Sequence, residues 1–406
     1  MTAIAEEKPE KSAVRAERPV AVSGIVDLTD GHGYLRTAGY RRSAADIPLT
    51  AAQVRQYGLR AGDEVHATLR PAPSGAPAAS PSSPSSAKNG KATGTRAVRS
   101  GGTLASVESV SGLSQEAAAR RPRFDDLTPV YPSERLRLED GDPSPAARII
   151  DLVAPIGKGQ RGLIVAPPKA GKTTVLKTIA HAVTLGHPEV HLMLILVGER
   201  PEEVTDLRRS VRGEVISSTF DQSPADHVKA AELAIERAKR LAELGQDVVV
   251  MLDSLTRLGR AYNLAAPAGG RTLSGGVAAS ALEPPRRFLG AARSLEEGGS
   301  LTILSTVLVD TGSQLDSVLF EEFKGTGNME LRLRRDLAEK RLFPAIDPVP
   351  SGTRREELLM APAEYAAVVS LRRALAALDS QHALELLLDK TTAPNEQLLR
   401  QVAASR

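Results

Sequence analysis

The hydrophobic and polar positions divide the chain into two regions with different patterns. From Val20 to Leu69, short segments alternate apolar and polar residues, and turns rich in Gly and Asp separate them. Such alternation is typical of half-buried strands. The same pattern returns in residues 103–110. We therefore predict a small β barrel or sandwich that residues 103–110 close.

From Arg148 onward, apolar runs alternate with amphipathic helical patterns, which predicts an α/β fold with a largely parallel sheet. The expected strands cover residues 162–166, 190–197, 214–219, 247–252 and 300–308. One helix is well delimited, because Ser223 suits its N-cap, Pro224 its first turn and Gly245 its exit. Its apolar stripe consists of Val228, Ala231, Ile235, Ala238 and Leu241. Residues 362–405 are also predicted to be helical.

Other segments lack such periodicity. Residues 71–102 consist mainly of Pro, Ser, Ala and Gly, a composition that cannot bury a core and predicts a flexible insertion. Residues 122–145 contain five prolines among charged residues and indicate an extended connector. The predicted units are a disordered leader at 1–20, the barrel domain at 21–115, a connector at 116–147, the α/β domain at 148–360 and a helical segment at 361–406.

Composition narrows the class of protein. The 406 residues are 41% hydrophobic and 25% charged, which suits a soluble globular protein. The net charge of +3 is too small to demonstrate a nucleic-acid partner. The chain has no Cys, which excludes disulfides and thiolate metal sites and favours a reducing cytoplasm. We expect no signal peptide and no membrane span, since no apolar run is long enough.

The most informative segment is the phosphate-loop pattern A-x4-G-K-T at residues 166–173. An apolar strand precedes it and a helical pattern follows it, as this loop requires. Backbone N–H groups of the loop wrap phosphate oxygens. Lys172 is expected to reach the terminal phosphates, and the Thr173 hydroxyl to hold Mg²⁺. The sequence therefore predicts binding, and hydrolysis, of a nucleoside triphosphate.

Two acidic residues follow predicted strands. Asp253 ends the apolar run 248–252, where phosphate-loop enzymes place a carboxylate that acts through Mg²⁺. The alternative is a turn or helix-cap residue. Glu199 ends the strand that begins near residue 190, a suitable position for a group that orients the attacking water. Its surroundings are rich in acids and arginines, and spacing alone favours surface ion pairing.

Phosphoryl transfer also requires positive charge near the terminal phosphate, often supplied by another subunit. Arg341 and Arg354 follow the last core strand and are candidates, although loop arginines are commonly solvated. Two Gly-rich loops, 263–276 and 310–314, suit a surface that moves with nucleotide state. Arg271 in the first is placed to contact a phosphate backbone. Ordinary surface loops are the alternative.

Several motifs together resemble the Rho family of bacterial transcription termination factors. They are APPKAGKT (166–173), ERPEEVTD (199–206), LDSLTR (252–257), EEGGSLTI (296–303), EEFKGTGNMEL (321–331) and SGTR (351–354). The resemblance covers most of 22–70 and 103–380. It implies a RecA-like ATPase that assembles as a homohexamer, translocates 5′ to 3′ along single-stranded RNA and dissociates RNA polymerase.

The resemblance also implies roles for individual residues. Lys172, Thr173 and Asp253 keep the roles given above, with ATP and Mg²⁺ as cofactors, and Glu199 becomes the catalytic carboxylate. Arg354 matches the arginine that acts in trans, and Arg341 a second interface arginine. Further nucleotide contacts are implied for Gly157, Lys158, Gly159, Gln160, Arg161, Gly162, Lys169, Ala170, Gly171, Thr174, Arg200 and Phe343. The loops 263–276 and 310–314 match those that line the RNA channel, which implicates Arg271 and Gln314.

The N-terminal region is similar to the cold-shock, or OB-type, RNA-binding barrel of the same family. Its motif, residues 31–36, includes His32, Tyr34 and Arg36, which we expect to contact RNA. Stacking on one ring contributes roughly 1–3 kcal/mol per base. A core position is the alternative for Tyr34. Pro48 stands where relatives often carry Tyr, and a proline offers no π face.

The chain departs from the family pattern elsewhere too. His32 replaces a common Phe, and Gln314 replaces a common Lys, which removes one charge from the expected channel. The family's small helical N-terminal subdomain is missing or reduced to residues 1–20. The insertion carries cations that would make loose RNA contacts: Lys88, Lys91, Arg96 and Arg99.

Three functions remain open at this point. The first is an RNA-dependent ATPase and helicase that terminates transcription. The second is a Rho paralogue that binds RNA and hydrolyses ATP without terminating. The third is a rotary-type ATPase subunit of a membrane motor or secretion system, which shares the sheet and the phosphate loop.

Overall fold

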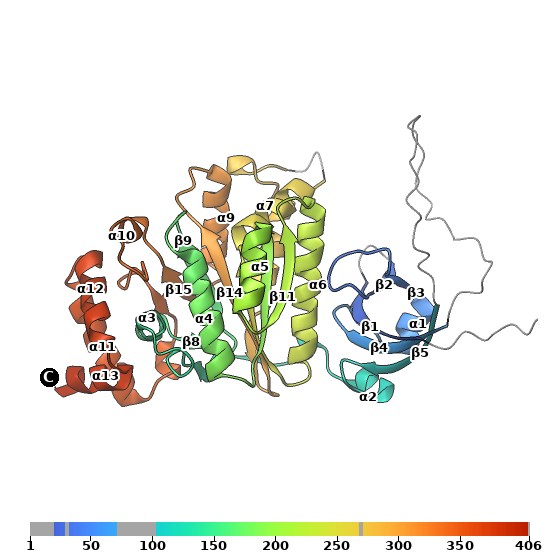
Figure 1. Cartoon of the computed structure of the whole chain (residues 1–406), viewed down its shortest axis with the longest axis horizontal. Coiled ribbons are helices and arrows are strands. Elements are labelled where there is room, and N and C mark those ends of the chain that lie inside the picture. The colour runs from blue at the N-terminus through green and yellow to red at the C-terminus, as the bar shows by residue number, and fades with distance from the viewer. Residues whose placement is uncertain (1–19, 29–31, 71–102, 268–270, 405–406) are drawn as a thin grey trace, which may run out of the picture.

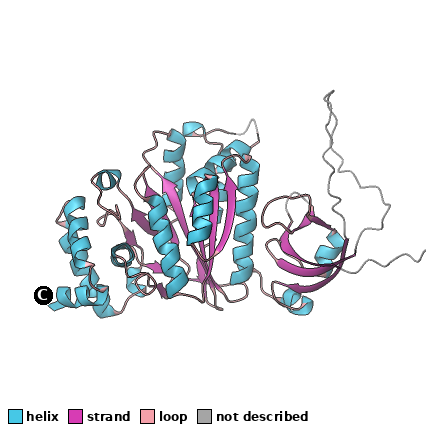
Figure 2. Ribbon diagram, viewed as in Figure 1, coloured by secondary structure: helices cyan, strands magenta, loops and turns pink. Residues whose placement is uncertain are grey.

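A computed structural model describes residues 20–28, 32–70, 103–267 and 271–404. The predicted leader, apart from residue 20, and the insertion 71–102 with its four cations lie outside the described residues. Figures 1 and 2 show a strand-rich domain beside a larger α/β domain, with further helices at the C-terminal end. In the described part of the chain, no helix combines the length and apolar character needed to cross a membrane.

The N-terminal domain is a curled antiparallel sheet. Its elements are β1 (Val20–Asp27), β2 (Gly33–Arg36), β3 (Ile47–Leu49), α1 (Ala51–Gln56), β4 (Glu64–Arg70) and β5 (Thr103–Val110). The strand order β3-β2-β1-β4-β5 brings the end strands β3 and β5 into contact around one apolar core. The expectation that residues 103–110 complete this sheet is confirmed, because β5 pairs with β4.

A mainly parallel sheet organises the α/β domain. Its main path runs β11-β10-β12-β14-β9-β15-β16, with β13 and β6 attached at β14. The strands are β6 (Pro129–Val130), β9 (Arg161–Ala166), β10 (His191–Glu199), β11 (Glu214–Thr219), β12 (Asp247–Asp253), β13 (Arg293–Leu295), β14 (Ser300–Leu308), β15 (Met329–Arg332) and β16 (Gly352–Thr353). All five predicted strands are present. The sequence analysis missed β13, β15 and β16, which are short.

Helices cover both faces of this sheet. Alternate residues of β10 show the division, because Leu194 packs with Ile179 of α4 in one core and Ile195 packs with Ala231 of α6 in the other. The helices of the domain are α3 (Pro145–Val153), α4 (Lys172–Gly186), α5 (Pro201–Ser210), α6 (Pro224–Ala242), α7 (Leu255–Ala265), α8 (Glu283–Gly290), α9 (Gln314–Lys324) and α10 (Arg335–Glu339). Helix α6 begins as predicted, because the Ser223 side chain accepts a hydrogen bond from the Asp226 N–H.

The C-terminal residues form three helices, as predicted for 362–405: α11 (Pro362–Ala376), α12 (Ser380–Lys390) and α13 (Asn395–Ala404). Their apolar residues, such as Leu371 and Leu384, belong to the same core as α4.

The predicted connector is more structured than the sequence suggested. It contains α2 (Gln115–Arg120), β6, and β7 (Arg135–Leu136), which pairs with β8 (Ile156–Gly157). Strand β6 pairs with β13. Proline can occupy such short edge strands because they leave one side of the backbone unpaired.

Buried charges attach the barrel to α6. The Glu243 side chain is fully buried and lies 3.0 Å from Arg240, 3.2 Å from Arg60 and 3.8 Å from Arg121. Its Oε1 also accepts a hydrogen bond of 2.7 Å from the Phe124 N–H. Arg121 in turn pairs at 2.6 Å with the buried Asp63 of the barrel. These contacts hold the barrel beside the helix that covers β10 and β12.

Candidate functional site

The predicted phosphate loop connects β9 to α4 at the carboxyl edge of the sheet (Figure 1). Lys169 and Gly171 both have positive φ, +68° and +85°, and Gly171 is the N-cap of α4. Ala170 between them is buried. Helix α4 therefore begins at Lys172 with its first N–H groups directed toward the loop, which is a favourable place for an anion.

Lys172 lies between two buried carboxylates. Its Nζ contacts Asp253 and lies 3.3 Å from Oε1 of Glu199. Asp253 also accepts a 2.8 Å hydrogen bond from the Thr306 hydroxyl of β14. The three residues that the sequence analysis took from separate motifs thus meet at one place. Thr306 was missed, because a hydroxyl within an apolar strand gives no signal of its own.

The electrostatics of Glu199 suit a proton acceptor. Burial raises the pKa of its carboxyl group, and the nearby negative charge of Asp253 raises this pKa further. The positive charges of Lys172 and Arg257 oppose this shift, and Arg257 Nε lies 3.2 Å from Oε1 of Glu199. Arg257 lies in the LDSLTR motif but received no role from the sequence.

The residues at the loop fit a magnesium ion. In the described part of the chain, no cluster of three His, Asp or Glu residues could hold a metal by itself. Thr173 lies in the first turn of α4, and its hydroxyl and the Asp253 carboxylate are oxygen donors, as Mg²⁺ prefers. Mg²⁺ typically binds through one or two protein ligands and substrate phosphates. In this structure the Lys172 ammonium group lies between the carboxylates of Glu199 and Asp253, which shows that these two side chains favour a positive charge at this place. Thr174, next along α4, is exposed.

Three further predicted residues lie near the loop. A Cβ placed on Gly171 would be 3.6 Å from the Phe343 ring, which is half-exposed. Arg341, with φ +62°, is two residues away from Phe343. Arg200 is exposed and caps α5 directly after Glu199. This arrangement leaves the Phe343 ring available to pack on a base.

Arg354 lies at the other end of the sheet. Its backbone N–H donates to the carbonyl of Asn328, and the Asn328 N–H donates to the carbonyl of Arg161 at the start of β9. The phosphate loop follows the end of the same strand. Arg341 and Arg354 therefore cannot face one nucleotide from one subunit. Arg341 lies two residues before Phe343, whose ring is close to Gly171 of its own loop, and its role as a second interface arginine stays a prediction.

The stretch 157–162 also lies at the amino end of β9, away from the phosphate loop. Lys158 is buried and pairs at 2.7 Å with Asp247. The Gln160 side chain donates to Asn328 at 2.7 Å, and the Gly159 N–H to Thr302 at 2.8 Å. Gly157 and Gly162 leave no space for a Cβ, because Leu359 and Leu304 would lie 2.7 and 2.5 Å from it. These contacts stabilise the fold, and they do not place the stretch at its own subunit's nucleotide.

The two Gly-rich loops meet at the carboxyl edge. A Cβ on Gly275 would be 2.9 Å from the backbone of Gln314, the first residue of α9. Arg271 is exposed nearby, and its carbonyl accepts a hydrogen bond from the Ala279 N–H. The second loop directly follows β14, the strand that carries Thr306. One strand therefore connects the nucleotide carboxylates to the loop 310–314. Residues 268–270 of the first loop lie outside the described residues.

The barrel carries a separate pocket of about 510 Å³. His32 and Tyr34 line it together with Pro48 and Arg55. His32 and Arg55 are exposed and Tyr34 is half-buried, so the pocket presents an imidazole, a ring and a cation on one surface. That combination suits an unstacked base and its phosphate.

Arg36 is not on the rim of this pocket. Its side chain is 3% exposed and forms ion pairs with Asp27 and Asp46. Its guanidinium carbon lies 5.0 Å from the centroid of the Tyr34 ring. Arg36 thus supports the ring from within the barrel, and its direct contact with RNA remains a prediction.

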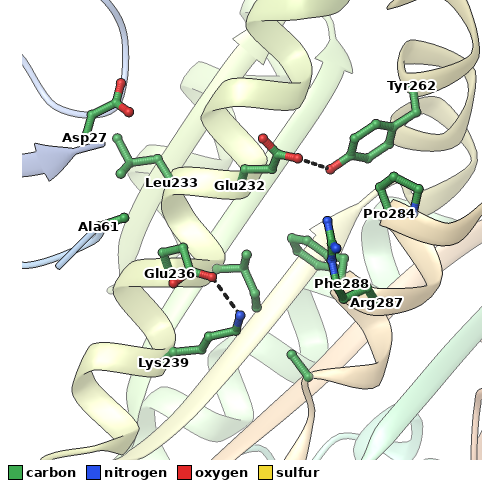
Figure 3. A pocket seen from close by; sticks show the side chains of 12 residues that line it. Asp27, Ala61, Glu232, Leu233, Glu236, Lys239, Tyr262, Pro284, Arg287 and Phe288 are labelled. Atoms are coloured by element: carbon green, nitrogen blue, oxygen red, sulfur yellow. Dashed lines mark hydrogen bonds and ion pairs between the residues drawn. The ribbon is translucent and has the colours of Figure 1, made fainter. Parts of the chain in front are cut away.

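Another cavity, of about 300 Å³, lies where the barrel meets α6, α7 and α8 (Figure 3). Glu232 and Tyr262 face each other across it with a 2.8 Å hydrogen bond, and Glu236 pairs with Lys239 at 2.6 Å. No residue predicted for the nucleotide or RNA sites lines it. It is therefore distinct from both sites.

Comparisons with known proteins match the two domains separately. Residues 22–116 match the family described as Rho termination factor, RNA-binding domain. Residues 146–353 match the nucleotide-binding domain of the ATP synthase alpha/beta family. The boundaries of these matches agree with the barrel and the α/β domain of the structure.

Relatives over nearly the whole chain bear the name transcription termination factor Rho. The protein of Streptosporangium roseum is 54% identical, over 99% of this chain and 99% of its own length. Those of Streptomyces lividans and Mycobacterium tuberculosis H37Rv are 56% and 54% identical over 94% of this chain. The chain spans only 52% and 61% of the length of these two.

Solved structures of secretion ATPases resemble the fold. A type III secretion system ATPase of pathogenic bacteria matches with a TM-score of 0.54 and 25% identity, over 69% of this chain and 82% of its own. The ATPase EscN of enteropathogenic E. coli matches with a TM-score of 0.51 and 27% identity, over 60% and 57%.

Proposed function

The chain belongs to the Rho family of transcription termination factors, and we propose that it is an ATP-driven RNA translocase that releases RNA polymerase. The observation that carries this proposal is that one chain combines a phosphate-loop site with a barrel pocket lined by His32 and Tyr34. Strand β14 contacts the phosphate-loop site through Thr306 and leads directly into the loop 310–314. We propose residues 21–115 as the RNA-binding domain and 148–360 as the ATPase domain. The proposed setting is the cytoplasm, in agreement with the absence of Cys.

The residues of the chain suit ATP hydrolysis. We propose that Lys172 leaves the two carboxylates when ATP binds and contacts the terminal phosphates, together with Lys169. Glu199 then orients a water molecule and accepts its proton as the oxygen attacks the terminal phosphorus. The bond to the bridging oxygen breaks, and ADP and phosphate are the products. Thr173 and Asp253 would hold Mg²⁺, which neutralises phosphate charge when bound.

The proposed assembly is a homohexameric ring. Arg354 lies at the opposite end of β9 from the phosphate loop, so it would act on a nucleotide held by a neighbouring subunit. Such an arginine contributes roughly 10³–10⁵ in rate. Head-to-tail contacts that close into a ring create this arrangement at every interface. Hydrolysis of each nucleotide would then depend on contact between neighbouring subunits.

The proposed RNA path runs from the barrel pocket to the two Gly-rich loops. Tyr34 and His32 would stack bases of single-stranded RNA, and Arg271 and Gln314 would contact RNA in the ring's channel. Because Thr306 contacts Asp253 and its strand continues into 310–314, loss of the terminal phosphate would move that loop.

Two variants separate the two sites. Lys172→Ala should abolish RNA-stimulated ATP hydrolysis while RNA affinity in the absence of nucleotide stays unchanged. Tyr34→Ala should weaken RNA binding by about 1–3 kcal/mol and leave ATP affinity unchanged. Lys177→Ala, on the same helix as Lys172 and paired with Asp206, is the matched control. Unchanged turnover in the Lys172 variant would refute the assignment.

A second candidate is a rotary-type ATPase subunit, which the similarity to the ATP synthase family and to secretion ATPases favours. The match of residues 22–116 to an RNA-binding domain opposes it. Acceleration of ATP hydrolysis by RNA distinguishes the two, because a rotary subunit should not respond to RNA. The paralogue that hydrolyses ATP without terminating is distinguished by transcript release.

A further inference from the structure

Three arginines gather at the amino end of β9. Arg161 begins β9, Arg293 begins β13 and Arg354 follows β16. Asn328 joins two of them, because its side-chain oxygen accepts from the Arg161 N–H at 2.8 Å and its carbonyl accepts from the Arg354 N–H at 2.8 Å. The third arginine, Arg293, is linked to Arg161 through the preceding residue, Ala292, whose carbonyl accepts a 3.1 Å hydrogen bond from Nη1 of Arg161.

Neutral groups hold the side chains of Arg161 and Arg293. Among the described residues, neither these two side chains nor that of Arg354 forms an ion pair with an acid. Arg161 Nε donates to the carbonyl of Thr326 at 3.1 Å. Arg293 Nε donates to the carbonyl of Ala291 at 3.2 Å, and its guanidinium carbon lies 4.7 Å from the centroid of the Phe124 ring. The side chains of Arg161 and Arg293 are therefore oriented, but no acidic partner neutralises their charges.

The positive charges act on one another. Burial lowers the pKa of Arg161 first, and the charges of Arg293 and Arg354 lower it further. Arg161 and Arg293 are half-buried and Arg354 is exposed, so the group opens to the surface through Arg354. Like charges held together without acids are unfavourable, and an anion bound there would remove that cost.

The anion cannot be the subunit's own nucleotide. The six residues of β9 separate the cluster from the phosphate loop by about 17–20 Å of strand. We propose that Arg161 and Arg293 join Arg354 in binding the terminal phosphates of ATP held by a neighbouring copy of the chain. This inference rests on the proposed ring and ATPase activity. It adds Arg293, to which the sequence analysis gave no role, and it assigns Arg161, a nucleotide contact that the resemblance already implied, to the part of the site that acts in trans.

The three arginines have different roles in binding the neighbour's phosphates. Arg354 is the exposed member and makes the direct contact during bond cleavage. Arg293, fixed on Phe124, and Arg161, fixed on two carbonyls, supply guanidinium groups that match phosphate oxygens. Because ADP lacks the terminal phosphate, the cluster distinguishes ATP from ADP.

Arg293→Gln is the main test, because glutamine keeps an amide donor for the Ala291 carbonyl and removes the charge. Affinity of the assembled protein for a non-hydrolysable ATP analogue should fall about 10- to 100-fold, as expected for loss of one charged hydrogen bond. Affinity for ADP should stay unchanged. Arg293→Lys should recover part of the analogue's affinity, and Arg400→Ala, on α13, should change neither. Equal affinities of wild type and Arg293→Gln for the analogue would overturn the proposal.

Mixed rings test whether Arg293 acts in trans. Subunits with Arg293→Gln are mixed with an equal amount of Lys172→Ala subunits, and single-turnover ATP cleavage is measured with RNA. If Arg293 acts on the neighbour, about one site in four combines an intact loop with an intact cluster, and cleavage returns to that extent. No recovery means that Arg293 acts within its own subunit, which overturns the inference.

A parallel mixture separates this inference from the proposed function. Subunits with Arg354→Ala are mixed with Lys172→Ala in the same way. Recovery with Arg354→Ala but not with Arg293→Gln would overturn the proposed role of Arg293 and leave the proposed ring intact. Failure of both mixtures would overturn the ring arrangement itself.

Discussion

Replacement of Glu199 by Gln is the most informative single change at the nucleotide site. The side chain keeps its shape at a position that is 4% exposed, but it can no longer accept a proton. General-base catalysis contributes typically 10²–10⁴-fold, or about 3–5 kcal/mol of barrier. We expect kcat for RNA-stimulated ATP hydrolysis to fall by about that factor, with little change in ATP affinity.

The pH dependence follows from the pKa of Glu199, which burial and the charge of Asp253 raise. The wild-type rate should fall as the pH decreases through that raised pKa, and Glu199→Gln should lose this limb. A raised folded pKa also means that ionised Glu199 destabilises the folded state at neutral pH, and that stability is gained as the pH falls through it. The nucleotide-free variant should therefore have a Tm at least equal to that of wild type.

The assays are steady-state ATP hydrolysis with RNA across pH, and thermal unfolding without nucleotide. Glu202→Gln, at an exposed position of α5, is the matched control and should behave as wild type. A kcat near that of wild type, or an unchanged acidic limb, would refute the assignment of Glu199 as the base. A large loss of Tm would instead indicate that Glu199 is structural.

Two further predictions concern the junction between domains and the channel. Glu243→Ala removes the buried carboxylate that Arg60, Arg121 and Arg240 share, so we expect destabilisation of about 3–5 kcal/mol and a clear decrease in Tm. The surface variant Glu396→Ala should leave the Tm unchanged, and equal Tm values for the two variants would contradict the proposed attachment of the barrel. Gln314→Lys should add one phosphate contact per subunit and steepen the slope of log affinity against log salt by about 0.7 per contact, in filter binding to single-stranded RNA. Gln397→Lys, at an exposed position of α13, is its control, and an equal slope for both variants would remove Gln314 from the RNA path.

Local patterns were sufficient for much of the fold. The strand before the phosphate loop, the cap at Ser223 and the alternation of strands and helices each depend on neighbouring residues, and the structure contains them. The placement of Asp253 beside the phosphate loop also followed, because parallel strands end at one edge of the sheet. The position of Glu199 beside Lys172 did not follow from spacing, which favoured surface ion pairing, and only the family resemblance indicated it.

Contacts between distant segments could not be predicted in this way. The separation of Arg354 from Arg341 depends on β15 and β16, whose two to four residues carry too little pattern to be recognised. The burial of Arg36 depends on ion pairs with Asp27 and Asp46, which strand alternation does not reveal. The cluster of Arg161, Arg293 and Arg354 likewise depends on the order of the sheet, in which β14 separates β13 from β9 and β15 separates β9 from β16.

Transcript release from a stalled RNA polymerase tests the central claim most directly. Purified protein is added to stalled elongation complexes with ATP, and released RNA is separated from bound RNA. We predict release that requires ATP and that is lost with Lys172→Ala. ATP hydrolysis that RNA stimulates, but without any release of transcripts, would contradict the proposed role in termination.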